Sequence, residues 1–208
     1  MRGLLLIILI LTGLGAAVTE PARAAADGLG PCRAAIDAAE RIERLPRLLL
    51  HAVSLAESGR WDPHRQASVA WPWTVNNGGE AKYLPSRDAA IALVRRLRAK
   101  GETNIDVGCM QINLKHHGAA FASLEEAIDP IHNVAYAARL LKKLRRDTGA
   151  WAHAIGQYHN AGWRTRGQPY WRRVRALWVD EQKSDFRKRR EARLRDTRKR
   201  RRRRESRR

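Results

Sequence analysis

Apolar residues recur at spacings of three and four from Asp27 to Trp178, and few stretches alternate apolar with polar residues. This period matches one face of an α-helix, whereas a half-buried strand alternates with a period of two. The interval holds about 150 residues, a length that favours one domain with one core. We therefore expect a single α-rich domain.

The most apolar of the expected helices lies between Pro46 and Gly59. Proline is favoured in the first turn of a helix and glycine just after its last turn, so these residues mark the two ends. Apolar residues lie on nearly every face of this segment, which predicts a buried helix. They are Leu48, Leu49, Leu50, Ala52, Val53, Leu55 and Ala56.

The segment from Ala67 to Leu84 departs from the helical pattern. Short extended residues around Trp71-Pro72-Trp73-Thr74 precede the turn-forming cluster Asn76-Asn77-Gly78-Gly79. This order predicts a small hairpin or a long loop inserted between helices. Helical spacing resumes after Ser86, a residue type favoured at helix N-caps.

The first 26 residues have the three regions of a secretory leader. Arg2 precedes the apolar run Leu4–Leu14, and small residues follow from Ala22 to Ala26. The run is shorter than the ~20 residues of a membrane-spanning helix, although a single-pass anchor is the alternative. We expect cleavage near Ala24 or Ala26 and a periplasmic or secreted mature protein.

Residues 183 to 208 hold 16 lysines and arginines against four acidic residues, which accounts for +12 of the formal net charge of +20. Like charges repel, and no apolar residue follows Leu194, so we expect a disordered tail, or one that is helical only in its first turns. The chain is then a leader (1–26), a domain (27–180) and a basic tail (181–208). An anionic envelope surface fits the tail of an exported protein better than nucleic acid does, and a merely solvated tail is the alternative.

Glu57 is the acidic residue at the C-terminal end of the apolar helix. Apolar surroundings disfavour a carboxylate, and a helix C-terminus adds partial negative charge. Both effects raise the pKa of this carboxyl, which keeps it protonated near neutral pH and able to donate a proton to a leaving oxygen. Glu57 is the candidate general acid, and a side chain that turns outward at the helix end is the alternative.

Three ordered motifs contain Glu57 and its candidate partners: Glu57-Ser58-Gly59, Gly108-Cys109-Met110-Gln111-Ile112-Asn113 and Tyr158-His159-Asn160-Ala161-Gly162. They resemble, in order and approximate spacing, the Glu-Ser, Gly-x-Met-Gln and Tyr-Asn motifs of the soluble lytic transglycosylases. The resemblance covers roughly Cys32 to Trp178. It implies a mainly α, lysozyme-like helical domain, with a small hairpin or loop insertion and the acid at the floor of a sugar-binding cleft.

The resemblance also implies a reaction on peptidoglycan, cleavage of the β-1,4 bond between N-acetylmuramic acid and N-acetylglucosamine. Glu57 would protonate the glycosidic oxygen and then, as a carboxylate, take the proton of the muramoyl C6 hydroxyl, which closes a 1,6-anhydro ring. Hydrolytic glycosidases normally use a second carboxylate. The candidates Asp62, Glu80 and Asp106 match no family motif, so we favour the non-hydrolytic route, which needs no cofactor.

Substrate-binding roles follow from the same resemblance. Ser58 would hydrogen-bond near the carboxyl or the substrate, Met110 would pack against the sugar, and Gln111 and Tyr158 would line the cleft. Asn113 ends the second motif and is a further candidate. Ordinary structural roles are the alternative, as core packing or as side chains that satisfy a buried turn.

The third motif departs from the family pattern. In one alignment Tyr158 takes the family tyrosine position and His159 replaces the asparagine. In the other, Asn160 aligns and His159 replaces the tyrosine. We favour the first, since Tyr158 continues the helical face of Trp151, but the sequence leaves both open.

The chain has two cysteines, Cys32 and Cys109, and one disulfide is the simplest expectation in an oxidising compartment. The rival hypothesis is a cysteine peptidase of the cell wall, with Cys109 as nucleophile and His159 as base, oriented by Asn160. A metal site that combines Cys109 with the pair His116–His117 lacks the paired spacing of zinc motifs, so we expect no metal.

The expected partner is the glycan strand of peptidoglycan. Small wall-cutting enzymes of the resembled family often serve wall-spanning assemblies, so a flagellar, secretion or conjugation apparatus is a further candidate. A protein that binds glycan or an anionic surface without catalysis is the remaining alternative.

Overall fold

The computed structural model describes residues 30–160 and 162–206, so the expected leader lies outside the described residues. The described residues are mainly α-helical, as the sequence predicts. The helices are α1 (Pro31–Glu43), α2 (Leu49–Ser58), α3 (Arg87–Ala99), α4 (Leu114–His117), α5 (Leu124–Ile128), α6 (Pro130–Thr148), α7 (Trp151–His159) and α8 (Gln168–Glu205), with the short turns η2 (Gly118–Ala120) and η3 (Trp163–Gly167).

Six short strands lie between α2 and α4 in the chain. Strands β1 (Gly59–Asp62) and β2 (Ala67–Ala70) form an antiparallel hairpin directly after α2. A second, antiparallel sheet has the order β4 (Lys82–Tyr83), β3 (Thr74–Asn76), β5 (Asp106–Val107), β6 (Ile112–Asn113). The expected hairpin insertion is therefore present as β3–β4. Strands β5 and β6 are two residues long, too short for a period to show in the sequence.

Helix α2 is the buried helix that the sequence predicts. All of its residues except Glu57 are buried. It begins at Leu49 and not near Pro46, because Leu48 has a left-handed backbone and the buried Glu40 carboxylate accepts the N–H groups of Leu48 and Leu50. That carboxylate occupies N–H groups that an N-cap side chain would otherwise take.

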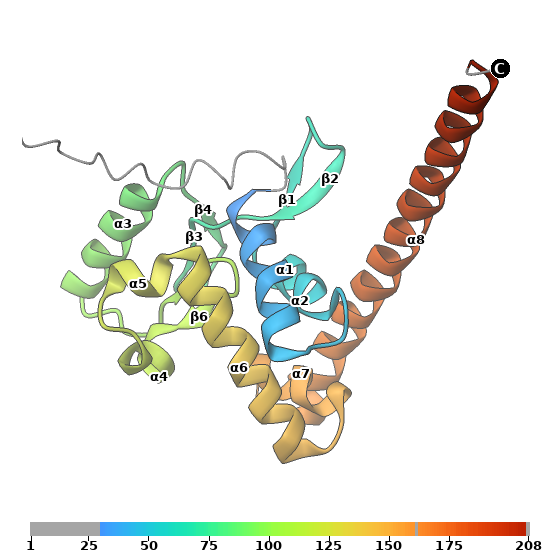
Figure 1. The fold of residues 1–208 in the computed structure, drawn as a ribbon. Coiled ribbons are helices and arrows are strands. Elements are labelled where there is room, and N and C mark those ends of the chain that lie inside the picture. Colours follow the sequence, from blue (N-terminus) through green and yellow to red (C-terminus); the bar gives the residue numbers. More distant parts are fainter. Residues whose placement is uncertain (1–29, 161, 207–208) are drawn as a thin grey trace, which may run out of the picture.

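The described side chains form two hydrophobic clusters. The larger one joins α1, α2, α6, α7 and the start of α8, and the smaller one joins α3, α5 and the second sheet. Phe121 packs against both. Helix α1 lies along α6, and α7 packs between α6 and α8 (Figure 1). The expected disulfide is present, and Cys32–Cys109 ties α1 to the turn between β5 and β6.

Helix α8 differs from the expected tail, because it continues without a break to Glu205 where the sequence predicts disorder. No glycine or proline follows Pro169, and ion pairs at i,i+4 spacing join opposite charges along the helix. These pairs are Arg189–Asp185, Arg195–Glu191 and Arg200–Asp196. The domain boundary expected after residue 180 falls inside this helix. None of the described helices is long and apolar enough to cross a membrane.

The first half of α8 packs on the domain. The Trp178 indole donates a hydrogen bond to the Arg47 carbonyl at 2.8 Å, and the Arg47 guanidinium pairs with Asp185 at 2.5 Å. His51, buried in α2, lies 3.4 Å from the Glu181 carboxylate. These contacts fix the end of α8 that carries Tyr170.

Candidate active site

Glu57 lies in the last turn of α2, and its side chain is 12% exposed. Burial raises the pKa of its carboxyl from 4.5 to about 7, and the nearby charge of Asp106 adds to the rise. A hydrogen bond from Tyr170 and the charge of Arg173 act in the opposite direction. The raised pKa expected from the apolar helix is confirmed, with burial as its main cause. A substantial fraction of Glu57 is therefore protonated at neutral pH.

Tyr170 is the closest polar partner of this carboxyl. Its hydroxyl, in the first turn of α8, donates to Glu57 Oε1 at 2.5 Å, and the residue is 6% exposed. The ring of His159 stacks on the Tyr170 ring, with 4.3 Å between the centroids and 5° between the planes. The Nδ1 atom of His159 lies 3.9 Å from Glu57 Oε1. One oxygen of Glu57 is thus flanked by two aromatic side chains.

The surroundings of His159 disfavour its protonated form. Burial lowers the pKa of its imidazole below the ordinary 6.5, and the charges of Arg166 and Arg173 lower it further, against Asp106. A neutral imidazole adds no positive charge that would stabilise the Glu57 carboxylate and lower the pKa of Glu57. This environment is compatible with a protonated acid.

The second motif forms a tight turn against the end of α2. Gly108 has a φ of +83°, and a Cβ there would lie 2.5 Å from the Asn133 side chain. Asn133 is fully buried, and its Oδ1 accepts the Met110 N–H at 2.9 Å while its Nδ2 donates to the Val107 carbonyl at 3.0 Å. Glycine is therefore required at 108, both for the backbone conformation and for the space that Asn133 fills.

Two hydroxyl groups hold the same turn from the other side. Ser58 is 0% exposed, and its Oγ donates to the Cys109 carbonyl at 2.7 Å. The half-buried Tyr158 donates its hydroxyl to the Met110 carbonyl at 2.7 Å. Met110 itself is fully buried in the larger core cluster. The structure thus places these three predicted site residues together. Ser58 follows Glu57 directly in the chain, and the hydroxyls of Ser58 and Tyr158 both bind the backbone of the turn that contains Met110.

Gln111 and Asn113 complete the second motif. Gln111 has a left-handed backbone with φ of 45°, and its amide donates to the carbonyls of Thr74 and Gly108 at 3.1 and 3.0 Å. The Asn113 side-chain carbonyl caps α4, and its amide donates to Asp106 Oδ1 at 2.7 Å. Both side chains are half-buried.

Of the three candidates for a second carboxylate, Asp106 is the one whose charge changes the pKa of Glu57. Burial raises the pKa of this aspartate, against the Asn113 hydrogen bond, and its charge raises the pKa of Glu57. Asp62 instead pairs with Arg65 on the β1–β2 hairpin, and Glu80 is exposed.

Sequence reasoning missed Tyr170 and Asn133. Asn133 had a signal, since it is a polar residue directly before the apolar face of α6 that begins with Val134. Tyr170 had little signal, because it is one of several aromatic residues after the third motif. Only packing shows that it reaches Glu57.

Cys109 carries no free thiol, because it forms the disulfide with Cys32. This bond removes the nucleophile of the peptidase hypothesis and the thiolate of the weaker metal hypothesis. A hydrogen bond of 2.8 Å joins His117 Nδ1 to the Tyr136 hydroxyl. Within residues 30–160 and 162–206, no cluster of three metal-ligating side chains occurs.

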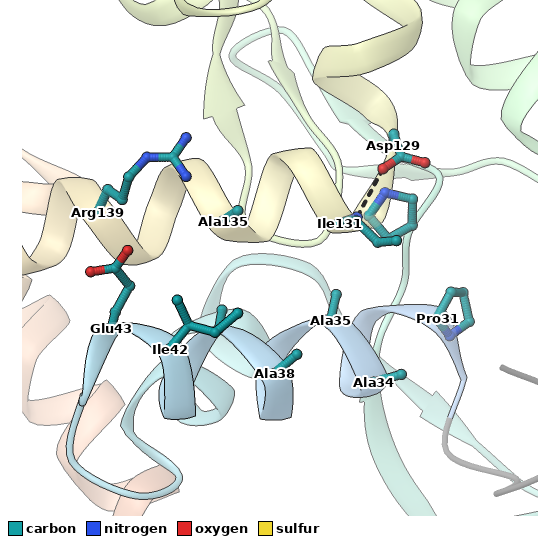
Figure 2. Close-up of a pocket in the computed structure, with 12 residues that line it drawn as sticks. Pro31, Ala34, Ala35, Ala38, Ile42, Glu43, Asp129, Ile131, Ala135 and Arg139 are labelled. Carbon is teal, nitrogen blue, oxygen red and sulfur yellow. Dashed lines mark hydrogen bonds between the residues drawn. The ribbon is translucent and has the colours of Figure 1, made fainter. Parts of the chain in front are cut away.

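A separate apolar cavity of about 460 Å³ lies between α1 and α6 (Figure 2). Alanines of α1 and the exposed side chains of Ile42 and Ile131 line it, with Glu43 and Arg139 facing each other at one end. Glu57 does not contribute to its walls. The cavity is therefore separate from the candidate active site around Glu57.

A mainly helical domain that buries one proton-bearing carboxyl at a helix end has the elements of acid-dependent glycan cleavage of the lysozyme type. The family described as the transglycosylase SLT domain matches residues 34–170, and the chain belongs to that family. Its members are peptidoglycan lytic transglycosylases, which are lyases that act in the periplasm or outside the cell. Searches of curated proteins and of solved structures found no match.

Proposed function

We propose that this protein is a peptidoglycan lytic transglycosylase that cleaves the β-1,4 bond between N-acetylmuramic acid and N-acetylglucosamine, with Glu57 as its only catalytic carboxyl. The observation that carries the proposal is the buried Glu57 carboxyl, whose pKa of about 7 leaves it able both to give and to take a proton at neutral pH. Family membership supports the substrate class.

In the first half-reaction, protonated Glu57 gives its proton to the glycosidic oxygen as the bond to the muramoyl C1 breaks. The carboxylate that forms is stabilised by the Tyr170 hydroxyl, which already donates to Oε1. In the second half-reaction, the carboxylate takes the proton of the muramoyl C6 hydroxyl while the C6 oxygen bonds to C1. The product is a 1,6-anhydromuramoyl end, and Glu57 is protonated again.

Substrate contacts are proposed for the second and third motifs. Gln111 and Tyr158 are half-buried and border the turn beside Glu57, so they are the side chains that we assign to the sugar. Ser58 and Met110 are fully buried, so their contribution to substrate binding passes through the position of the Cys109–Met110 backbone. Asn113 contributes indirectly, because its side-chain amide donates a hydrogen bond to Asp106. The wall-spanning assembly that such an enzyme serves stays a prediction.

Hydrolysis is the second candidate, because the Asp106 charge acts on Glu57 and a second carboxylate can activate water. Asp106→Asn separates the two reactions. In a transglycosylase this variant keeps the anhydro products and shows a lower pKa for Glu57, since a charge that raises this pKa is removed. In a hydrolase that uses Asp106, the variant loses cleavage.

The deciding experiment is mass spectrometry of the products released from purified peptidoglycan. The native protein and the exposed control Glu80→Gln are expected to release 1,6-anhydromuropeptides, and Glu57→Gln to release none. Glutamine preserves the size of the side chain and an acceptor for Tyr170, so the loss reports the missing proton. Reducing-end products from the native protein would contradict the transglycosylase route.

A further inference from the structure

The second half of α8 extends away from the rest of the molecule (Figure 1). From Phe186 to Arg200 every residue is exposed. Residues 187 to 205 include 13 arginines and lysines and three acidic residues. At 1.5 Å per residue this segment is about 28 Å long. It is a cationic rod fixed to the domain at one end.

The two faces of α8 differ in composition. Glu181 and Asp185 point toward α2 and its preceding loop, where they pair with His51 and Arg47. Successive residues of an α-helix are rotated by about 100° around its axis. The side opposite Glu181 and Asp185 is the roughly one third of the circumference centred 180° away from them. We define this side as the outer face. Between residues 183 and 198 it consists of Lys183, Phe186, Arg187, Arg190, Leu194, Thr197 and Arg198.

The outer face combines cations with exposed apolar side chains and holds no acidic residue. Phe186 is 67% exposed and Leu194 is 51% exposed, and they are flanked by Lys183, Arg190 and Arg198. Helices that lie in a membrane interface have this composition, with apolar side chains at the acyl boundary and basic ones at the headgroups. The long arginine and lysine stems let the charges reach the phosphates while the apolar tips lie deeper.

We propose that the outer face of α8 binds the surface of an anionic phospholipid membrane, with the helix lying in the plane of the interface. The domain is then carried on the opposite face, through the contacts of Glu181 and Asp185 with His51 and Arg47. Nucleic acid fits less well, because its phosphate backbone offers no apolar layer for Phe186 and Leu194, and the family acts outside the cytoplasm.

The test is co-sedimentation of the exported form, starting at Asp27, with lipid vesicles at about 0.15 M salt, where charges more than about 8 Å from the surface are screened. Vesicles of phosphatidylcholine with about one quarter phosphatidylglycerol are compared with pure phosphatidylcholine. The expected result is binding at least about 100-fold tighter to the anionic vesicles. Equal binding to both would overturn the proposal.

Two variants with the same loss of charge locate the binding face. The outer-face variant replaces Lys183, Arg187, Arg190 and Arg198 with glutamine, and the control variant replaces Lys188, Lys199, Arg202 and Arg203. Each outer-face cation near the surface contributes about fivefold, so the first variant is expected to bind about 100-fold more weakly or worse, and the control less than about tenfold. Equal losses would show that total charge decides binding, and would overturn the assignment of a face.

The apolar side chains are tested in the same way. Phe186→Ala with Leu194→Ala is expected to weaken vesicle binding about tenfold, whereas Ile42→Ala with Ile131→Ala, a pair at least as exposed on α1 and α6, leaves it unchanged. Circular dichroism checks that each variant keeps its helix content. Binding to a short DNA duplex through the outer face, without vesicle binding, would identify a nucleic-acid site and overturn the proposal.

Discussion

The Tyr170 hydroxyl donates to Glu57 Oε1 at 2.5 Å and joins the first turn of α8 to the last turn of α2 across 113 positions of sequence. Because α8 is also fixed to the α2 end of the domain by Trp178 and Asp185, the position of this hydroxyl is set by helix packing. The pKa of Glu57 therefore depends on a contact between α2, near the start of the domain, and α8, at its end.

Tyr170→Phe removes this hydrogen bond, which lowers the pKa of Glu57 in the native protein. The variant is expected to have a higher pKa at Glu57, so the fall in cleavage rate on the alkaline side moves toward higher pH. The measurement is the initial rate of turbidity loss of a peptidoglycan suspension against pH. Tyr158→Phe is the control, because its hydroxyl donates to the Met110 carbonyl and not to Glu57. An equal displacement of the alkaline limb in both variants would contradict the assignment.

Glu57→Gln is expected to change the pH dependence of stability. The folded-state pKa of about 7 exceeds the ordinary 4.5, so the folded protein binds the proton more tightly than the unfolded chain. The contribution of Glu57 to the free energy of unfolding therefore falls as pH rises from about 4.5 to about 7 and then levels off. Glutamine does not titrate, so at pH 8 the variant gains up to about 3 kcal/mol relative to the native protein, compared with their difference at pH 4. Urea unfolding at the two pH values measures this gain, and Glu80→Gln should show none.

Gly108→Ala tests the close approach of Asn133 to the second motif. Gly101 is a matched control, since its φ of +85° is nearly the same as the +83° of Gly108 but no atom lies within 4 Å of its added Cβ. Gly101→Ala is expected to cost about 1 kcal/mol, from the left-handed backbone alone. Gly108→Ala is expected to cost about 3 kcal/mol or more, because Asn133 must also move and release the Met110 N–H. Equal losses in urea unfolding would mean that Asn133 yields without cost.

Loss of the Cys32–Cys109 disulfide is expected to destabilise the protein. The bond links residues 77 positions apart, and closing a loop of this length in the unfolded chain corresponds to about 4 kcal/mol. Cys32→Ala with Cys109→Ala should lower the free energy of unfolding by about that amount in urea. Thiol titration of the unreduced native protein should find no free thiol. A reactive Cys109 would restore the peptidase hypothesis.

Local sequence patterns predicted much of the helical part of the fold. The period of three and four predicted the α-class, and the nearly continuous apolar segment predicted the burial of α2, because both signals depend on residues within a few turns of each other. The prediction for Glu57 was also local, since a single acidic residue among apolar neighbours can be recognised without knowing the fold. The full length of helix α8 was not predicted, because charge repulsion was weighed and the i,i+4 ion pairs along α8 were not.

The sequence alone determined a helical chain with one buried acid at the end of its most apolar helix. The tertiary structure decided which groups set the properties of that acid. Tyr170, His159 and Asp106 come from α8, α7 and β5. His159 lies in one of the three ordered motifs, but nothing in the sequence indicated that Tyr170 or Asp106 would act on the Glu57 carboxyl. Burial and hydrogen bonding act over a few ångströms in space, whereas these residues are separated by 49 to 113 positions in the chain, so only packing brings them together.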